Sequence, residues 1–181
     1  MATTGMAVLV AIALGGSAIV AAERIPPDNR LYEVKLATEK FRLVLAGSDS
    51  QKVKLNANFV DNRMAELTYV VPEGNPDKIE RVVKILDRNL EGIRSVAQVG
   101  AAAASLSEFY LPESPEYDIE KDELRPFLRS YARKHNKELR QLFVESPASA
   151  QKPMLDALRL TWASYRSALE SVGEDPDIVS N

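Results

Sequence analysis

Hydrophobic residues recur every three or four positions along most of this chain, the spacing that places them on one face of an α-helix. Prolines, glycines and short polar residues interrupt the pattern at intervals and divide it into segments. The predicted helices cover about 31–46, 50–71, 76–111, 119–145 and 148–172. No segment shows the strict alternation that is typical of a half-buried strand. The sequence therefore predicts an all-α fold.

The spacing within each segment also predicts which side of each helix faces the core. In the first helix the apolar stripe is formed by Leu31, Val34, Thr38, Phe41 and Leu45. Near-heptad spacing of this kind favours long antiparallel helices with coiled-coil-like packing. We expect a helical hairpin domain over 31–111, a second hairpin over 119–172, and a flexible tail over 173–181. Because Pro126 is tolerated best in a first turn, the fourth helix is expected to begin between Ile119 and Glu123.

An uncharged stretch precedes these helices. Residues 5–22 read GMAVLVAIALGGSAIVAA, and as a helix they would be about 27 Å long, close to the thickness of a bilayer core. Three interpretations are open: a single-pass membrane anchor, a signal peptide cleaved near Ala22, or a buried helix of a soluble core. A polar hinge at 23–30 contains Pro26 and Pro27, which prevent a helix over 5–22 from continuing.

The basic residues near this stretch bear on its orientation. They all follow it, at Arg24, Arg30, Lys35 and Lys40, and none precedes it. The positive-inside rule, applied to these residues alone, predicts that the C-terminal helices lie in the cytoplasm.

Composition excludes several functions. The 181 residues carry a formal net charge of −3, so no strongly basic face is forced, and we predict no nucleic-acid partner. Cysteine is absent, which excludes disulfides, thiolate metal sites and cysteine nucleophiles. The sequence has no glycine-rich phosphate loop and no nucleophile motif. We therefore predict a protein that is not an enzyme and binds no cofactor.

The single histidine is the one residue that invites a metal hypothesis. His135 lies on the apolar stripe of the fourth helix, and Glu138 follows three residues later on a neighbouring part of the same face. Two ligands do not make a metal site, so a carboxylate from another helix would have to complete it. We interpret His135 as a partly buried structural residue and keep His135 with Glu138 as the candidate metal pair.

The first hundred residues resemble a known family. A hydrophobic segment is followed by a proline turn, the motif L-Y-x-V-K-x-x-x-E, and a second helix that contains R-x-A-E-like residues. The positions that carry this pattern are Pro27, Leu31, Tyr32, Val34, Lys35, Glu39, Arg63, Ala65 and Glu66. In this respect the chain resembles a bacterial domain family of unknown function found outside the membrane helix of anti-sigma-factor-like proteins.

The resemblance implies an extracytoplasmic helical domain that is tethered by one membrane helix, the orientation opposite to that given by the charge rule. It implies no catalytic residues, because the family has no established activity. Within the motif, Lys35 and Glu39 stand four residues apart and are expected to pair along the helix surface.

These observations lead to two functional hypotheses. The first is a membrane-tethered extracytoplasmic module for interaction or sensing, linked to anti-sigma-type regulation and acting on a protein partner without catalysis. The alternative is a secreted or periplasmic helical binding or chaperone-like protein, released by signal cleavage near Ala22.

Overall fold

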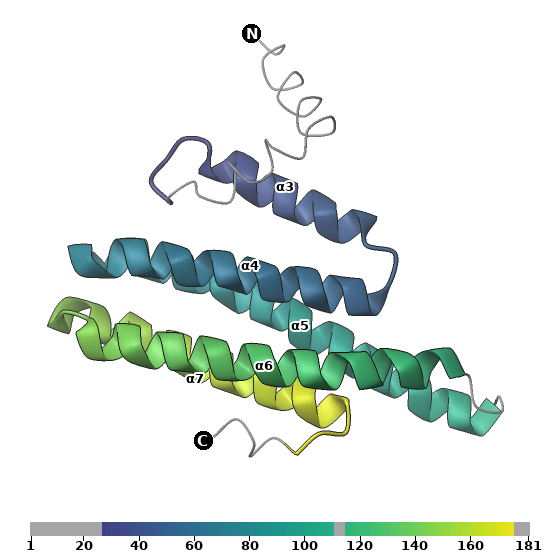
Figure 1. Cartoon of the computed structure of the whole chain (residues 1–181). Helices are drawn as coiled ribbons and strands as arrows, with labels where there is room; N and C mark the ends of the chain where they lie inside the picture. The colour runs from purple at the N-terminus through teal and green to yellow at the C-terminus, as the bar shows by residue number, and fades with distance from the viewer. Residues whose placement is uncertain (1–26, 111–114, 176–181) are drawn as a thin grey trace, which may run out of the picture.

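The computed structural model describes the backbone of residues 27–110 and 115–175, and the side chains of 27–99, 102 and 122–175. Within these ranges the chain forms five α-helices, one short 3-10 helix and no strand. The helices are α3 (Tyr32–Leu45), α4 (Asp49–Val70), α5 (Pro76–Tyr110), α6 (Pro115–Glu145) and α7 (Ala148–Ser171), with the 3-10 helix η1 at Val71–Glu73. The all-α prediction is confirmed (Figure 1).

The helix ends follow from local chemistry. Ser48 caps α4, because its hydroxyl oxygen accepts a hydrogen bond from the backbone N–H of Gln51 at 3.2 Å. Gly74 adopts a φ of 65° at the end of η1, a conformation that glycine reaches without strain, and Pro76 opens α5. The predicted ends of four helices agree with the structure to within about one residue.

The start of α6 differs from the prediction. The helix begins at Pro115 and continues through Pro126 instead of starting near Ile119 or Glu123. A proline inside a helix removes one backbone hydrogen bond to the carbonyl four residues earlier. That carbonyl belongs to Asp122, which is exposed, so water can satisfy it.

The last four helices form a bundle made of two antiparallel hairpins, α4–α5 and α6–α7, laid side by side (Figure 1). Helix α5 packs on α4 and α7, and helix α6 packs on α7 and α4. Contacts from Lys54 to Glu123 and from Asn58 to Tyr131 show that α4 and α6 run in the same direction. The turns of the two hairpins meet at one end of the bundle, where Ser149 donates a hydrogen bond to the carbonyl of Gly74 at 2.8 Å.

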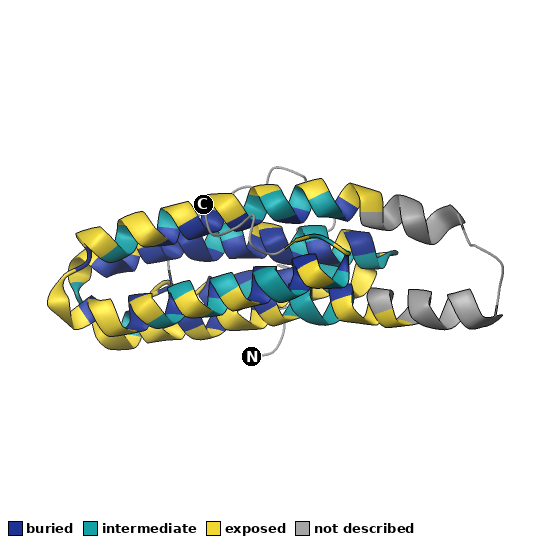
Figure 2. Ribbon diagram, turned by 90° about the horizontal axis from the view of Figure 1, so that it is seen from below, coloured by how far each residue is buried: buried dark blue, intermediate teal, exposed yellow. Residues whose placement is uncertain are grey.

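The core lies between these four helices, whose inward faces are buried and whose outward faces are exposed (Figure 2). Its fully buried members include Val60, Leu67, Ile79, Leu86, Leu90, Ile93, Leu128, Leu139, Met154 and Tyr165. Helices α4 and α5 approach closely at Gly92, because a Cβ atom there would lie 2.6 Å from the side-chain oxygen of Asn56.

Helix α3 lies against α4 on the side away from α6, and it is oriented differently from the prediction (Figure 1). Three members of the expected core stripe, Leu31, Phe41 and Leu45, are 52%, 57% and 66% exposed. The face that packs on the bundle instead carries Tyr32 and two charged residues. The prediction of a core-facing stripe on this helix is therefore wrong.

Candidate functional site

Five polar side chains hold α3 on α4, and together we call them the α3–α4 charge cluster: Tyr32, Lys35, Glu39, Arg63 and Glu66. The ammonium of Lys35 donates to Glu66 at 2.8 Å, and the hydroxyl of Tyr32 donates to the other oxygen of Glu66 at 2.7 Å. The guanidinium of Arg63 donates to Glu39 at 2.8 Å and lies 3.0 Å from Glu66. All five residues are buried.

Helical spacing explains why these residues meet. Tyr32, Lys35 and Glu39 are three and four residues apart, so they occupy one face of α3. Arg63 and Glu66 are three residues apart and occupy the facing side of α4. The expected position of Lys35 and Glu39 on the helix surface is therefore wrong, because both residues are buried and each also contacts α4. Two cations and two carboxylates leave the cluster neutral.

Burial controls the protonation of the cluster. Loss of solvent raises the pKa of Glu39 above its ordinary value, although Arg63 and the amide of Asn62 oppose this shift. Burial also raises the pKa of Tyr32 far above its ordinary value, so the hydroxyl remains a donor to Glu66. The guanidinium of Arg63 lies 5.8 Å from the centre of the Tyr32 ring, within the range of a cation–π contact.

Such a cluster gives geometric specificity more than net stability. Removing four charges from water costs desolvation free energy, and the attraction between the buried charges is about equal to that cost. Removing one member is different, because its partner is then buried without compensation. The α3–α4 interface is therefore sensitive to changes in any one of its charges.

The opposite side of α3 is apolar and faces outward. We call it the α3 apolar face: the exposed residues Leu31 (just before the helix), Ala37, Phe41, Val44 and Leu45, with the half-buried Val34. A helix that covers a bundle usually buries its apolar side and exposes its polar side. Here the cluster reverses this arrangement, because the charged partners on α4 dictate which side of α3 turns inward.

A second buried network joins α4, α6 and α7 around His135. One ring nitrogen of His135 lies 2.8 Å from the hydroxyl of Tyr165, and the other lies 2.6 Å from a carboxylate oxygen of Asp61. The same oxygen of Asp61 accepts a hydrogen bond from Lys134 at 2.6 Å. His135 is fully buried, whereas the sequence analysis predicted partial burial.

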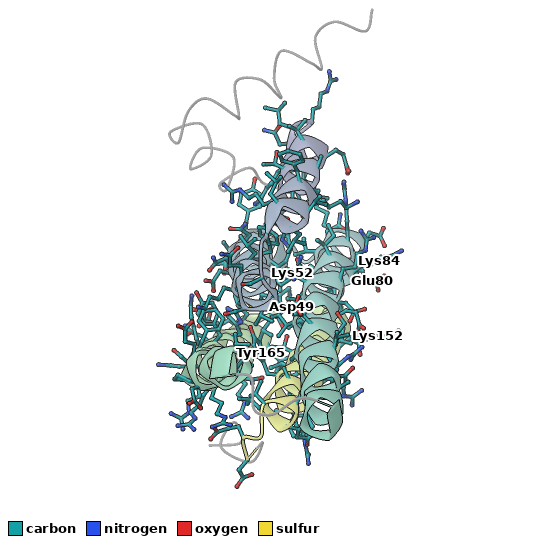
Figure 3. All side chains as sticks on the ribbon, turned by 90° about the vertical axis from the view of Figure 1, so that its right-hand side faces the viewer. Asp49, Lys52, Glu80, Lys84, Lys152 and Tyr165 are labelled. Atoms are coloured by element: carbon teal, nitrogen blue, oxygen red, sulfur yellow. The ribbon has the colours of Figure 1, made fainter. Side chains whose placement is uncertain are left out.

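Electrostatics keep Asp61 ionised in this network. Burial alone would raise the pKa of Asp61, but hydrogen bonds from His135 and Lys134 outweigh it and lower the pKa. Burial raises the pKa of Tyr165 well above its ordinary value. An acid, a histidine and a hydroxyl in a row resemble a catalytic relay. However, the side chain of Tyr165, a residue labelled in Figure 3, is fully buried. No substrate could reach it, so we interpret the network as a structural link between three helices.

The structure brings Asp61 into contact with His135, but it does not place His135 and Glu138 in a three-ligand group within the described residues. Glu138 and Asp61 line a hollow of about 450 Å³ between α4 and α6, beside the buried His135. In the part of the chain that the structure describes, no three histidine, aspartate or glutamate side chains are grouped so that they could hold a metal ion.

Two further hollows lie on the surface. One, of about 680 Å³, lies along the seam between α5 and α7 and is lined by residues of both charges, among them Glu80, Lys84 and Lys152, which Figure 3 shows along one flank. The other, of about 400 Å³, lies between α3, α4 and α5 and has Leu36, Phe59 and Asn89 among its lining residues. The side chains that line these two hollows do not suggest a catalytic or metal-binding role.

Sequence reasoning located the residues of the charge cluster but not their role. All five belong to the motif on which the family resemblance rests, and the structure brings them into one place. The signal that could have predicted this is the 32–35–39 spacing, which sets polar residues on one face of a helix whose other face is apolar.

The fold and the site together define an all-α protein: a four-helix bundle to which an N-terminal helix is attached through buried charges. The family model described as a domain of unknown function (DUF5667) matches residues 24–147, more than half of the chain, and the chain belongs to this family. No curated protein and no solved structure matches it. Membership of a family of unknown function is thus confirmed, over a range that begins after the hydrophobic segment and ends between α6 and α7.

The membrane predictions concern a different part of the chain. The segment 5–22 lies outside the residues that the structure describes. Among the helices of 27–110 and 115–175, none is both long enough and apolar enough to cross a bilayer.

Proposed function

We propose that this chain is a membrane-tethered module for interaction or sensing, with its helical bundle outside the cytoplasm, and that it acts without catalysis. The observation that carries the proposal is the orientation of α3. This helix follows the uncharged segment 5–22 after a short polar hinge, is fixed to the bundle by the α3–α4 charge cluster, and turns its apolar face outward. A helix arranged in this way is suited to contacts outside its own domain.

A sensing role requires two arrangements that a partner binds with different affinity. The charge cluster is consistent with two such states: one in which its charges are buried and paired between α3 and α4, and one in which α3 is detached and all of the charges are solvated. A partner that binds α3 only when it is detached would shift the balance between these states. For anti-sigma-type regulation, the change in α3 would pass through the tether to a partner across the membrane.

The location can be tested with one engineered cysteine, because the chain has none of its own. Gln151 is exposed in the first turn of α7, so Gln151→Cys offers a reactive thiol without disturbing the core. We expect a membrane-impermeant maleimide to label this variant in intact cells. Labelling that requires lysis would place the bundle in the cytoplasm and contradict the proposal.

The tether needs a separate measurement. We expect the chain to remain in the membrane fraction after carbonate extraction, with residues 5–22 still attached. N-terminal sequencing that finds a soluble product beginning at Glu23 would instead support the secreted binding protein.

A further inference from the structure

The α3 apolar face is the main concentration of exposed large apolar side chains in the described part of the chain. Leu31, Phe41, Val44 and Leu45 all belong to it, whereas the other such residues are scattered over α4, α5, α6 and α7. Val44 is 81% exposed. Contiguous apolar patches on a protein surface mark sites of contact with another molecule or with a membrane.

Its place in the chain favours a membrane. The uncharged segment ends at Ala22, and nine residues lead from there to Leu31. Nine residues reach at most about 30 Å when fully extended. If the segment lies in a bilayer, α3, whose 14 residues form a helix about 21 Å long, is kept close to the bilayer surface.

The charges around the face fit anionic headgroups. Arg30, just before the helix, and Lys40, beside Phe41 at one edge of the face, are both exposed. The nearby acids are directed to other helices: Glu33 pairs with Arg81 on α5 at 2.7 Å, and Glu39 pairs with Arg63 on α4. An apolar stripe with basic edges is typical of helices that lie in the interface of anionic membranes.

We propose that the α3 apolar face lies in the headgroup region of a bilayer that contains anionic lipids, as a second membrane contact besides the segment 5–22. This inference rests on the proposed tether. Because α3 and α4 run antiparallel, the bundle then lies along the membrane surface and does not project away from it (Figure 1).

Two matched positions allow a direct test on the full chain. Val44→Cys places a fluorophore on the α3 apolar face, and Val144→Cys places it on α6 at a residue of the same type and the same 81% exposure. Each labelled protein is reconstituted into vesicles of phosphatidylcholine and phosphatidylglycerol whose acyl chains carry bromine, a short-range quencher. We expect the label at position 44 to be quenched several-fold more strongly than the label at 144.

The lipid dependence and a charge variant complete the test. Quenching at position 44 should weaken in vesicles without phosphatidylglycerol and at high salt, because the basic edges then lose their partner. Adding Phe41→Glu should abolish the quenching at position 44 while circular dichroism stays unchanged, since the side chain of Phe41 is 57% exposed. Equal quenching at 44 and 144 would overturn the inference.

The outcomes separate this inference from the proposed tether. If the chain fails to float with vesicles, the tether itself fails. If it floats but the label at 44 is not quenched, only the second contact is overturned. A blue shift at 44 that grows with the ratio of protein to lipid, without bromine quenching, would assign the face to a second copy of the chain.

Discussion

Arg63 is the residue on which the α3–α4 interface depends most. It is fully buried and contacts both carboxylates of the charge cluster, one on its own helix and one on α3. Arg63 donates the hydrogen bond that joins Glu39 to α4, at 2.8 Å, so Glu39 loses this buried partner when Arg63 is replaced.

Replacing Arg63 with methionine should release α3 from the bundle. The change keeps most of the volume but leaves buried carboxylates uncompensated, which costs about 3–5 kcal/mol. These charges lie at the α3–α4 interface and not between the helices of the bundle. We therefore expect hydrogen exchange to accelerate throughout α3 and to stay slow in α5. Arg94→Met is the control, since Arg94 pairs with Glu91 on the surface, where such pairs contribute little. Unchanged exchange in α3 of the Arg63 variant would refute the assigned role.

The pH dependence of stability should reveal Asp61. Its pKa is lowered in the folded protein, so the ionised carboxylate stabilises the fold above its ordinary pKa of 3.8, and this stabilisation is lost as the pH falls through and below that value. Between about pH 5 and pH 3, the free energy of unfolding should therefore fall more steeply in the wild type than in Asp61→Asn. Urea denaturation at several pH values measures the difference. Parallel curves would show that Asp61 is not held ionised by the fold.

At the scale of helices, most of the fold could be predicted from the sequence. Pro76, Gly74 and Pro147 mark helix ends by chemistry that is local, and the apolar spacing within each segment does not depend on what packs against it. The direction that a stripe faces is not local. The face of α3 was predicted wrongly because the carboxylate and guanidinium that reverse it are supplied by α4, 24–34 residues later in the chain.

The same reasoning applies to the candidate sites. His135 was found because it is the only imidazole, but its partners Asp61 and Tyr165 come from two other helices and share no motif with it. Lys35 and Glu39 were assigned to the surface because charged residues are rarely buried. Only the packing of α3 on α4 identifies them as interior residues.

The close approach of α4 and α5 predicts a sensitive glycine. Gly92→Ala would place a Cβ atom 2.6 Å from the buried amide of Asn56, so we expect a loss of about 1–3 kcal/mol despite the better helix propensity of alanine. Gly47→Ala is the control, because its nearest neighbour would be 3.7 Å away. Thermal denaturation measures both variants. Adding Asn56→Ala should restore part of the loss, and a failure to do so would contradict the steric explanation.

At the scale of the whole molecule, the order of helices around the bundle is its least predictable property. Short turns predict two antiparallel hairpins, but they do not say which helix of one hairpin faces which helix of the other. The structure pairs α5 with α7 and α4 with α6, so each hairpin meets the other along helices that run in the same direction.

Cross-linking can verify this order. The side chains of Gln98 on α5 and Ser167 on α7 lie 3.1 Å apart and are close to the surface. In the cysteine-free background, the pair Gln98→Cys and Ser167→Cys should be joined within one chain by a short bismaleimide, detected by mass spectrometry of the digested protein. Each single variant serves as the control for reactivity. If both singles react but the pair gives no intramolecular product, α5 and α7 are not neighbours.

The α3–α4 charge cluster also has a consequence for the order of folding. Hairpins α4–α5 and α6–α7 are built from contacts between neighbouring segments, which form quickly. The cluster becomes favourable only when its charges leave water together, so α3 gains little from a partly formed α4. We therefore expect α3 to pack last, after the bundle of α4–α7 has formed, although α3 precedes those helices in the chain.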